Sequence, residues 1–242
     1  MKFSAEHLPF LLLLCGGLAF SIGKKKLSIA GAITGALCGT IIYLGSGYLG
    51  FLSMTAFFLL GTIATSIGRR QKVEVEKRGD TPQRNYKQVL ANAGMGTLLA
   101  LFALADPAHL QVYEILIAVS MASASADTLS SELGMVWGKQ FYNCITWKKE
   151  ARGLDGVISI QGTLAGICAA SFIAFLYAGF HGFGWSFFLI VFCGAIGSHA
   201  DSIIGATLER KNRVSNDAVN FLSTLVAVLS AFLIILISQS AS

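Results

Sequence analysis

The chain has 242 residues, of which 54% are apolar and 13% charged, about half the charged share of an ordinary soluble domain. Apolar runs of roughly twenty residues, with the charges confined between them, indicate a membrane protein with several spans and exclude a large soluble domain. The net charge of +5 reflects basic connections that set the orientation in the membrane and face anionic lipid headgroups. No aromatic and basic pattern for base stacking accompanies it, so no nucleic-acid partner is expected.

Eight apolar runs are expected to cross the membrane as helices. They occupy residues 8–23, 27–44, 49–67, 88–105, 110–126, 157–179, 184–208 and 217–238. The predicted fold class is all-α, a polytopic bundle of about eight transmembrane helices, or seven if the short first run is incomplete. The whole chain, 1–242, is expected to form a single transmembrane domain.

Basic residues predict the orientation of this bundle. Four connections hold 17 of the 18 Lys and Arg residues, and the alternate connections hold none. The basic connections are 24–26, 69–87, 127–156 and 209–216. Because positively charged loops stay on the cytoplasmic side, these four are expected to face the cytoplasm and both termini to be external. Polar residues gather at the same face, in five stretches at the ends of spans four to eight, so an active site is expected there.

The first polar stretch, "EKRGDTPQRNYKQVLANAG" at 76–94, combines basic residues with amides at the start of an expected helix. The basic residues are Arg78, Arg84 and Lys87, and the amides are Asn85, Gln88 and Asn92. The amides are spaced i, i+3 and i+7, so they share one helix face. A helix N-terminus with cations nearby binds anions, which favours a phosphate site. The alternative, anchoring to lipid headgroups, is preferred for the upstream Arg69, Arg70 and Lys72.

The second stretch, "SASADTLSSELG" at 123–134, carries two carboxylates at the end of an apolar run. Asp127 and Glu132 are five residues apart, which is about 140° around a regular helix. Both can reach one ligand only if the helix ends or breaks between them, and we expect that break near Ser130 or Gly134. The alternative is a helix C-terminus rich in hydroxyls with a solvated Glu132.

The remaining three stretches place polar residues at the ends of spans six, seven and eight. "GVISIQGTLAG" opens span six with Ser159, Gly162 and Thr163, which suits phosphate binding, or close helix packing through its glycines. "GSHADSIIGATLE" places Asp201 inside span seven, where a carboxylate is costly unless it is paired or binds a metal. "NDAVN" opens span eight with Asn216, Asp217 and Asn220, and helix capping by Asn216 is the alternative to a binding role.

Five motifs, taken in order, carry a resemblance to a known family. They are "RNYKQVLANAG", "ASADTLSSELG", "GVISIQGTLAG", "ADSIIGATLE" and "NDAVNFLST". They resemble the DUF92 family of integral membrane proteins, which includes the phytyl-phosphate kinases of the vitamin E pathway and TMEM-type animal proteins. The resemblance implies a catalytic core at about 76–224 and a bacterial inner membrane or a thylakoid membrane. It also implies transfer of a γ-phosphoryl group from a nucleotide, CTP, to an isoprenyl monophosphate such as phytyl or geranylgeranyl phosphate.

On this interpretation Asp127, Glu132 and Asp201 are the expected catalytic residues, which hold Mg²⁺ on the donor phosphates. The expected phosphate and nucleotide ligands are Arg78, Arg84, Asn85, Lys87, Asn92, Ser159, Gly162, Thr163, Asn216, Asp217 and Asn220. The partners are CTP, the isoprenyl monophosphate and membrane lipid, and no oligomeric state is predicted.

Two other functions are compatible with the same residues. A membrane cytidylyltransferase would use the same lipid phosphate and CTP but release pyrophosphate. An ion-coupled transporter would place polar residues near the midplane and on both faces, whereas here they crowd one face.

Overall fold

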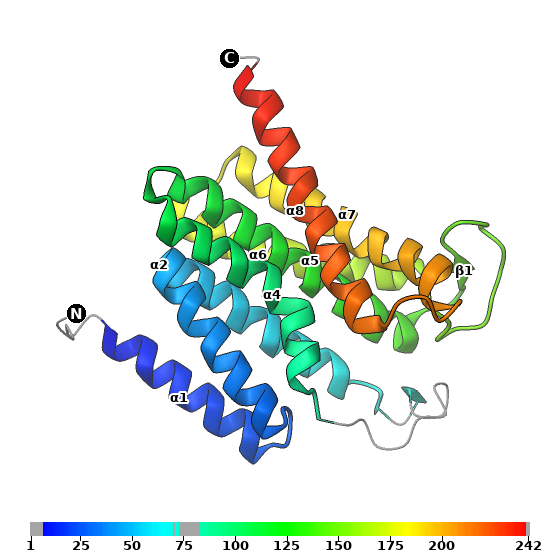
Figure 1. The fold of residues 1–242 in the computed structure, drawn as a ribbon. Helices are drawn as coiled ribbons and strands as arrows, with labels where there is room; N and C mark the ends of the chain where they lie inside the picture. The colour runs from blue at the N-terminus through cyan, green and yellow to red at the C-terminus, as the bar shows by residue number, and fades with distance from the viewer. Residues whose placement is uncertain (1–6, 70, 73–82, 241–242) are drawn as a thin grey trace.

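The computed structural model describes residues 7–69, 71–72 and 83–240 (Figure 1). Within them, helices form nearly all of the regular structure. The helices are α1 (Leu8–Gly23), α2 (Ile29–Ser66), α4 (Tyr86–Ala105), η2 (Pro107–His109), α5 (Leu110–Trp137), α6 (Ile160–His181), α7 (Trp185–Ile204), η3 (Gly205–Glu209) and α8 (Asn216–Ser240). Six of those in the described ranges are long and apolar enough to cross a membrane. The predicted fold class, an all-α polytopic membrane protein, is confirmed.

Helix α2 bends sharply at Gly47. A straight helix of its 38 residues would be about 57 Å long, nearly twice the hydrocarbon thickness of about 30 Å. Gly47 interrupts it with φ 63° and ψ −151°, a conformation that only glycine adopts readily. The two arms then fold back on each other (Figure 1), so that a Cβ at Gly39 would lie 3.4 Å from the ring of Phe51.

The bend bears on the expected number of spans. The arms of α2 correspond to the predicted runs 27–44 and 49–67, which the structure joins through one residue. Helix α1 is apolar but has only 16 residues. The predicted count of eight is therefore reached only when both arms of α2 and the short α1 each cross the bilayer.

Helix α5 lies at the centre of the bundle. Every residue from Leu116 to Ala126 is buried, and α5 packs against α2, α4, α6, α7 and α8. Small residues let the neighbouring helices approach closely: a Cβ at Gly166 of α6 would lie 2.8 Å from the carbonyl oxygen of Ala126. Because α5 touches so many helices, side chains near its C-terminal end face several of them at once.

The segment between α5 and α6 folds back onto the end of α7. It contains a two-stranded antiparallel sheet, β1 (Tyr142–Asn143) and β2 (Val157–Ile158), which the sequence analysis did not predict. Arg210 fastens this segment, because its Nη2 donates to Glu150 Oε2 at 2.7 Å and its Nε donates to the carbonyl of Asp155 at 2.5 Å. We call the end of the bundle that carries β1 and β2 the loop end; the start of α1 and the end of α8 lie away from it (Figure 1).

Candidate active site

A cavity of about 660 Å³ opens at the loop end of the bundle. Its walls come from α2, α4, α5, α6, α7, η3 and α8, and from the segments that precede α4, α6 and α8. Eleven predicted site residues line it: Arg84, Asn92, Asp127, Glu132, Ser159, Gly162, Thr163, Asp201, Asn216, Asp217 and Asn220. Residues from five widely separated sequence stretches therefore meet at one polar cavity.

Three other predicted ligands lie elsewhere or outside the described structure. Asn85 is the N-cap of α4, and its side-chain oxygen accepts from the backbone N–H groups of Lys87 and Gln88 at 2.9 and 3.1 Å. Asn85 and Lys87 are exposed and do not line the cavity. Asn85 therefore stabilises the start of α4 rather than facing the cavity. Arg78 lies outside the described residues.

Four carboxyl groups gather on the α7 side of the cavity, and we call them the acidic group: Asp127, Asp155, Asp201 and Glu209. The carboxyl groups of Asp127 and Asp201 approach each other, and those of Asp155 and Glu209 lie close enough to act electrostatically on Asp201. Oδ2 of Asp201 is buried and has no hydrogen-bond partner among the described residues. Like charges at this depth destabilise one another unless a proton or a cation lies between them.

The acidic group suits a hard divalent cation. Mg²⁺ prefers carboxylate oxygens, and it usually takes one or two of them together with substrate phosphate oxygens. The facing side chains of Asp127 and Asp201 provide two such ligands, and the unpartnered Oδ2 of Asp201 leaves a lone pair free. In the described part of the chain, no three or more His, Cys, Asp or Glu side chains are grouped so that they could hold a metal ion by themselves. These residues therefore fit Mg²⁺ in a site that phosphate oxygens would complete.

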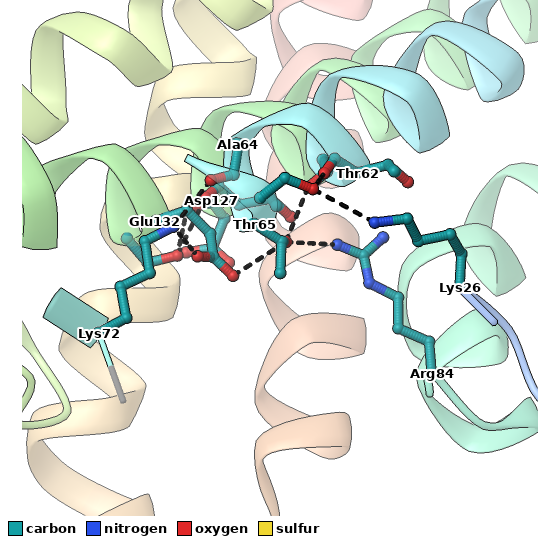
Figure 2. Close-up of polar contacts among 12 residues, drawn as sticks. Lys26, Thr62, Ala64, Thr65, Lys72, Arg84, Asp127 and Glu132 are labelled. Atoms are coloured by element: carbon teal, nitrogen blue, oxygen red, sulfur yellow. Dashed lines mark hydrogen bonds and ion pairs between the residues drawn. The ribbon is translucent and has the colours of Figure 1, made fainter. Parts of the chain in front are cut away.

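Glu132 belongs to a different network, which Figure 2 shows. Lys72 Nζ donates to Glu132 Oε2 at 2.5 Å and to the carbonyl oxygen of Ala64 at 2.7 Å. Thr65 Oγ1 lies 3.1 Å from Glu132 Oε1 and accepts from Arg84 Nη2 at 3.2 Å. Glu132 is thus held by the cation of Lys72 and by the hydroxyl of Thr65 at the end of α2.

Two predictions about this region are wrong. Helix α5 continues without a break from Leu110 to Trp137, so the expected break is absent. Asp127 and Glu132 are about 140° apart around the helix, although both line the cavity. Lys72 does not serve as an exposed headgroup anchor, because it is 6% exposed and paired with Glu132. The structure therefore groups Asp127 with Asp201 and groups Glu132 with Lys72.

Arg84 contributes a partly buried cation to the cavity wall. Its backbone is fixed to the turn before α2, because Arg84 N donates to Lys26 O at 3.1 Å and Ser28 N donates to Arg84 O at 3.0 Å. Burial lowers the pKa of the Arg84 guanidinium from its usual value, and the charge of Glu132 acts in the opposite direction. An arginine remains protonated under such a shift. Arg84 therefore presents a fixed positive charge near the amide side chains of Gln88 and Asn92, which line the same cavity.

The starts of α6 and α8 also reach the cavity. Ser159 caps α6, and its Oγ accepts from Gly162 N at 3.1 Å while its carbonyl accepts from Thr163 N at 2.9 Å. These two N–H groups are thus already used. Gly162 also packs closely, since a Cβ there would lie 2.5 Å from Ser130 O. The close helix packing that the alternative interpretation held is therefore present at Gly162, and phosphate binding there stays a prediction that packing does not exclude.

Helix α8 is capped by Ser215, whose Oγ accepts from Ala218 N at 3.3 Å. The expected cap, Asn216, is instead the first residue of the helix. Asn216, Asp217 and Asn220 all line the cavity, so capping does not explain the amide of Asn216.

The places of Asp155 and Glu209 could not be predicted from the sequence. Asp155 lies just before the motif that opens span six. Glu209 lies eight residues after Asp201, about 80° away on a regular helix. The structure places the π-helix η3 at Gly205–Glu209. Its wider turn brings Glu209 back toward the face of Asp201, and such turns are frequent at functional sites. The π-helix has no simple sequence signal, so regular spacing could not reveal this contact.

Comparison with known proteins agrees with the membrane fold. The family model described as "Integral membrane protein DUF92" matches residues 12–228. An uncharacterised membrane protein of Methanocaldococcus jannaschii is 33% identical over 90% of this chain and 90% of its own. An uncharacterised membrane protein of Synechocystis is 32% identical over 85% of this chain and 83% of its own. Protein VTE6, chloroplastic, of Arabidopsis thaliana is 30% identical over 84% of this chain and 65% of its own. No solved structure matches the chain.

Proposed function

Because the chain belongs to the DUF92 family of integral membrane proteins, we propose that it is a lipid-phosphate kinase. It would transfer the γ-phosphoryl group of CTP to an isoprenyl monophosphate, such as phytyl or geranylgeranyl phosphate, and produce the diphosphate. One observation carries this proposal: a single cavity combines facing carboxylates, Asp127 and Asp201, with a partly buried guanidinium, that of Arg84. The similarity to Protein VTE6, chloroplastic, and the resemblance to phytyl-phosphate kinases support the choice of an isoprenyl acceptor and a role in the vitamin E pathway.

In this proposal the acidic group serves the nucleotide. Asp127 and Asp201 would hold Mg²⁺, which when bound supplies charge neutralisation for the donor phosphates. Glu132 has no metal-binding role in the proposal, because Lys72 and Thr65 already hold its carboxylate. Asn216, Asp217 and Asn220 line the cavity at the start of α8 and are proposed to contact the nucleotide.

Arg84 and the amides of α4 would bind the acceptor. Arg84 donates hydrogen bonds to the acceptor phosphate, and Gln88 and Asn92 orient it. An oxygen of that phosphate attacks the γ-phosphorus, the bond from the γ-phosphorus to the β–γ bridging oxygen breaks, and CDP leaves. The second pKa of a phosphate monoester is about 6, so the attacking oxygen is largely ionised near neutral pH. Positioning and charge neutralisation then provide most of the acceleration.

The test incubates the purified, lipid-reconstituted protein with CTP, Mg²⁺ and phytyl phosphate. Formation of CDP and phytyl diphosphate is the expected result. Release of pyrophosphate would instead identify a cytidylyltransferase, and no turnover with any isoprenyl phosphate would refute both reactions. A further arm replaces CTP by ATP, GTP or UTP, which tests the choice of base.

Two variants and a control locate the chemistry within the protein. Asp127→Asn and Asp201→Asn each remove one carboxylate charge from the acidic group, and a loss of about a hundredfold or more in turnover is expected. Asp106→Asn is the matched control, because Asp106 lies at the opposite end of α4, where it contacts His109 at 2.8 Å. Near-normal turnover in either of the first two variants would contradict the metal assignment for that residue.

A further inference from the structure

A second cavity, of about 130 Å³, lies between α1, both arms of α2 and α4. Its lining is mostly apolar and includes Leu14, Met54 and Phe58. Four residues, Phe57, Arg84, Gln88 and Asn92, line this cavity and the polar one alike. The apolar cavity therefore ends at the wall that carries the Arg84 guanidinium of the candidate active site.

We propose that the apolar cavity binds the first part of the acceptor's hydrocarbon tail, next to its phosphate. The inference rests on the proposed function. A single-chain lipid monophosphate has one charged end and one apolar end. The two cavities offer the matching surfaces in the same order, with Arg84, Gln88 and Asn92 at the junction. An apolar cavity elsewhere in a membrane bundle could hold any lipid chain, whereas this one meets the cation of Arg84 at one end.

The size of the cavity limits what it holds. A dry apolar cavity of about 150 Å³ in another protein binds one benzene molecule, which has six carbon atoms. A cavity of about 130 Å³ therefore holds roughly one five-carbon isoprene unit. Leu13 of α1 lines the cavity and is 48% exposed. The wall therefore opens toward the bilayer at α1, and the remaining isoprene units lie in lipid. The cavity accordingly binds the part of the tail nearest the phosphate. It therefore discriminates only weakly between acceptors whose tails differ in total length.

Gly35 offers a way to fill the cavity without moving the backbone. It lines the cavity from the first arm of α2. A Cβ there would meet Leu27 Cδ1 at 3.9 Å and Val89 Cγ1 at 4.0 Å, which are ordinary contact distances. Gly16 of α1 is the matched control, since it does not line the cavity and a Cβ there would meet nothing within 4 Å. The variants Gly35→Leu and Gly16→Leu add the same side chain inside and outside the cavity.

The first experiment is photocrosslinking with a phytyl phosphate analogue that carries a diazirine on its first isoprene unit. The expected labels fall on α1, α2 and α4 and are lost in Gly35→Leu but kept in Gly16→Leu. Labels confined to α5–α8 would overturn the proposal. So would equal labelling by the matching alcohol, phytol with the same diazirine, because the site would then not depend on the phosphate.

The second experiment measures the KM for phytyl phosphate and for CTP. Gly35→Leu should raise the KM for phytyl phosphate by about tenfold or more and leave that for CTP unchanged, whereas Gly16→Leu should change neither. Equal KM values for phytyl phosphate in the two variants would overturn the tail site. Labelling needs no turnover, so the two proposals can fail separately. Labels in the cavity without turnover would refute the kinase and support the tail site. Turnover with labels elsewhere would support the kinase and refute the tail site.

Discussion

Replacing Lys72 by methionine removes the cation that neutralises Glu132 and keeps a side chain of similar length. The side chains of Lys72 and Glu132 are 7% and 21% exposed, so the pair is largely buried. Breaking a buried pair from one side costs about 3–5 kcal/mol, because the remaining charge is left without its partner. Glu132 keeps its contact with Thr65 at 3.1 Å and some access to solvent. We therefore expect a loss of about 3 kcal/mol, which changes the unfolding equilibrium by about 140-fold.

The double variant Lys72→Met/Glu132→Gln tests the electrostatic origin of that loss. It removes both charges, so it should be more stable than Lys72→Met alone, and the coupling of the two changes should be about 1–3 kcal/mol. Lys26→Met is the control, since Lys26 Nζ makes an exposed contact with Ser66 Oγ at 3.2 Å and its loss should cost less than about 0.5 kcal/mol.

The free energy of unfolding is measured by titrating the reconstituted protein with a denaturing detergent, and turnover is measured in parallel. One result would refute the reasoning: wild-type stability in Lys72→Met, together with a Glu132→Gln variant that folds normally but is inactive. Glu132 would then act on a ligand, as the sequence analysis expected, and its ion pair would be incidental.

Three further predictions test the cap, the helix packing and the loop end. Asn85→Ala should lower stability by about 1 kcal/mol and leave both KM values unchanged, and a rise in either would assign Asn85 to binding. Gly166→Ala places a Cβ 2.1 Å from Ser130 Oγ and should cost about 1–3 kcal/mol in a thermal melt, whereas Gly179→Ala, with nothing within 4 Å, should not destabilise. The hydrogen bond from Arg210 lowers the pKa of Glu150 below its usual 4.5. Its stabilising effect is therefore present above pH 4.5 and is lost as the pH falls through the lowered value. Glu150→Gln should weaken hydrogen-exchange protection of residues 140–158 at pH 7, and the difference from wild type should vanish in acid; a difference independent of pH would exclude a charge effect.

The membrane fold and the meeting of distant motifs could be predicted from the sequence. Apolar runs separated by charge predict helices and their limits because hydrocarbon excludes charged groups. Polar residues at the ends of successive spans come together because neighbouring antiparallel helices share an end. For this reason the polar stretches that contain Asp127, Asp201 and Asn216 could be expected to lie close in space.

The detailed contacts could not be predicted in the same way. Whether Glu132 reaches the acidic group depends on the continuity of α5, and the polar residues of "SASADTLSSELG" allow a break as well as a helix. Lys72 lies in a basic connection, where exposure is the usual state, and only the tertiary fold brings it to Glu132. Glu209 depends on one wide helical turn that regular spacing does not predict. Each missed feature is a tertiary contact or a local departure from regular geometry.

The bend at Gly47 has a consequence for the way the protein enters its membrane. One residue joins the two arms of α2, and the segment around it, "GSGY" at 45–48, carries no charge. A connection this short cannot hold one arm in the bilayer while the other arm remains in water. The arms should therefore insert together as a preformed hairpin, whose uncharged tip costs little to carry through the hydrocarbon. During translation, the two arms of α2, residues 29–66, are then expected to insert into the membrane as one unit. A charged residue placed at the tip of this hairpin should delay its insertion.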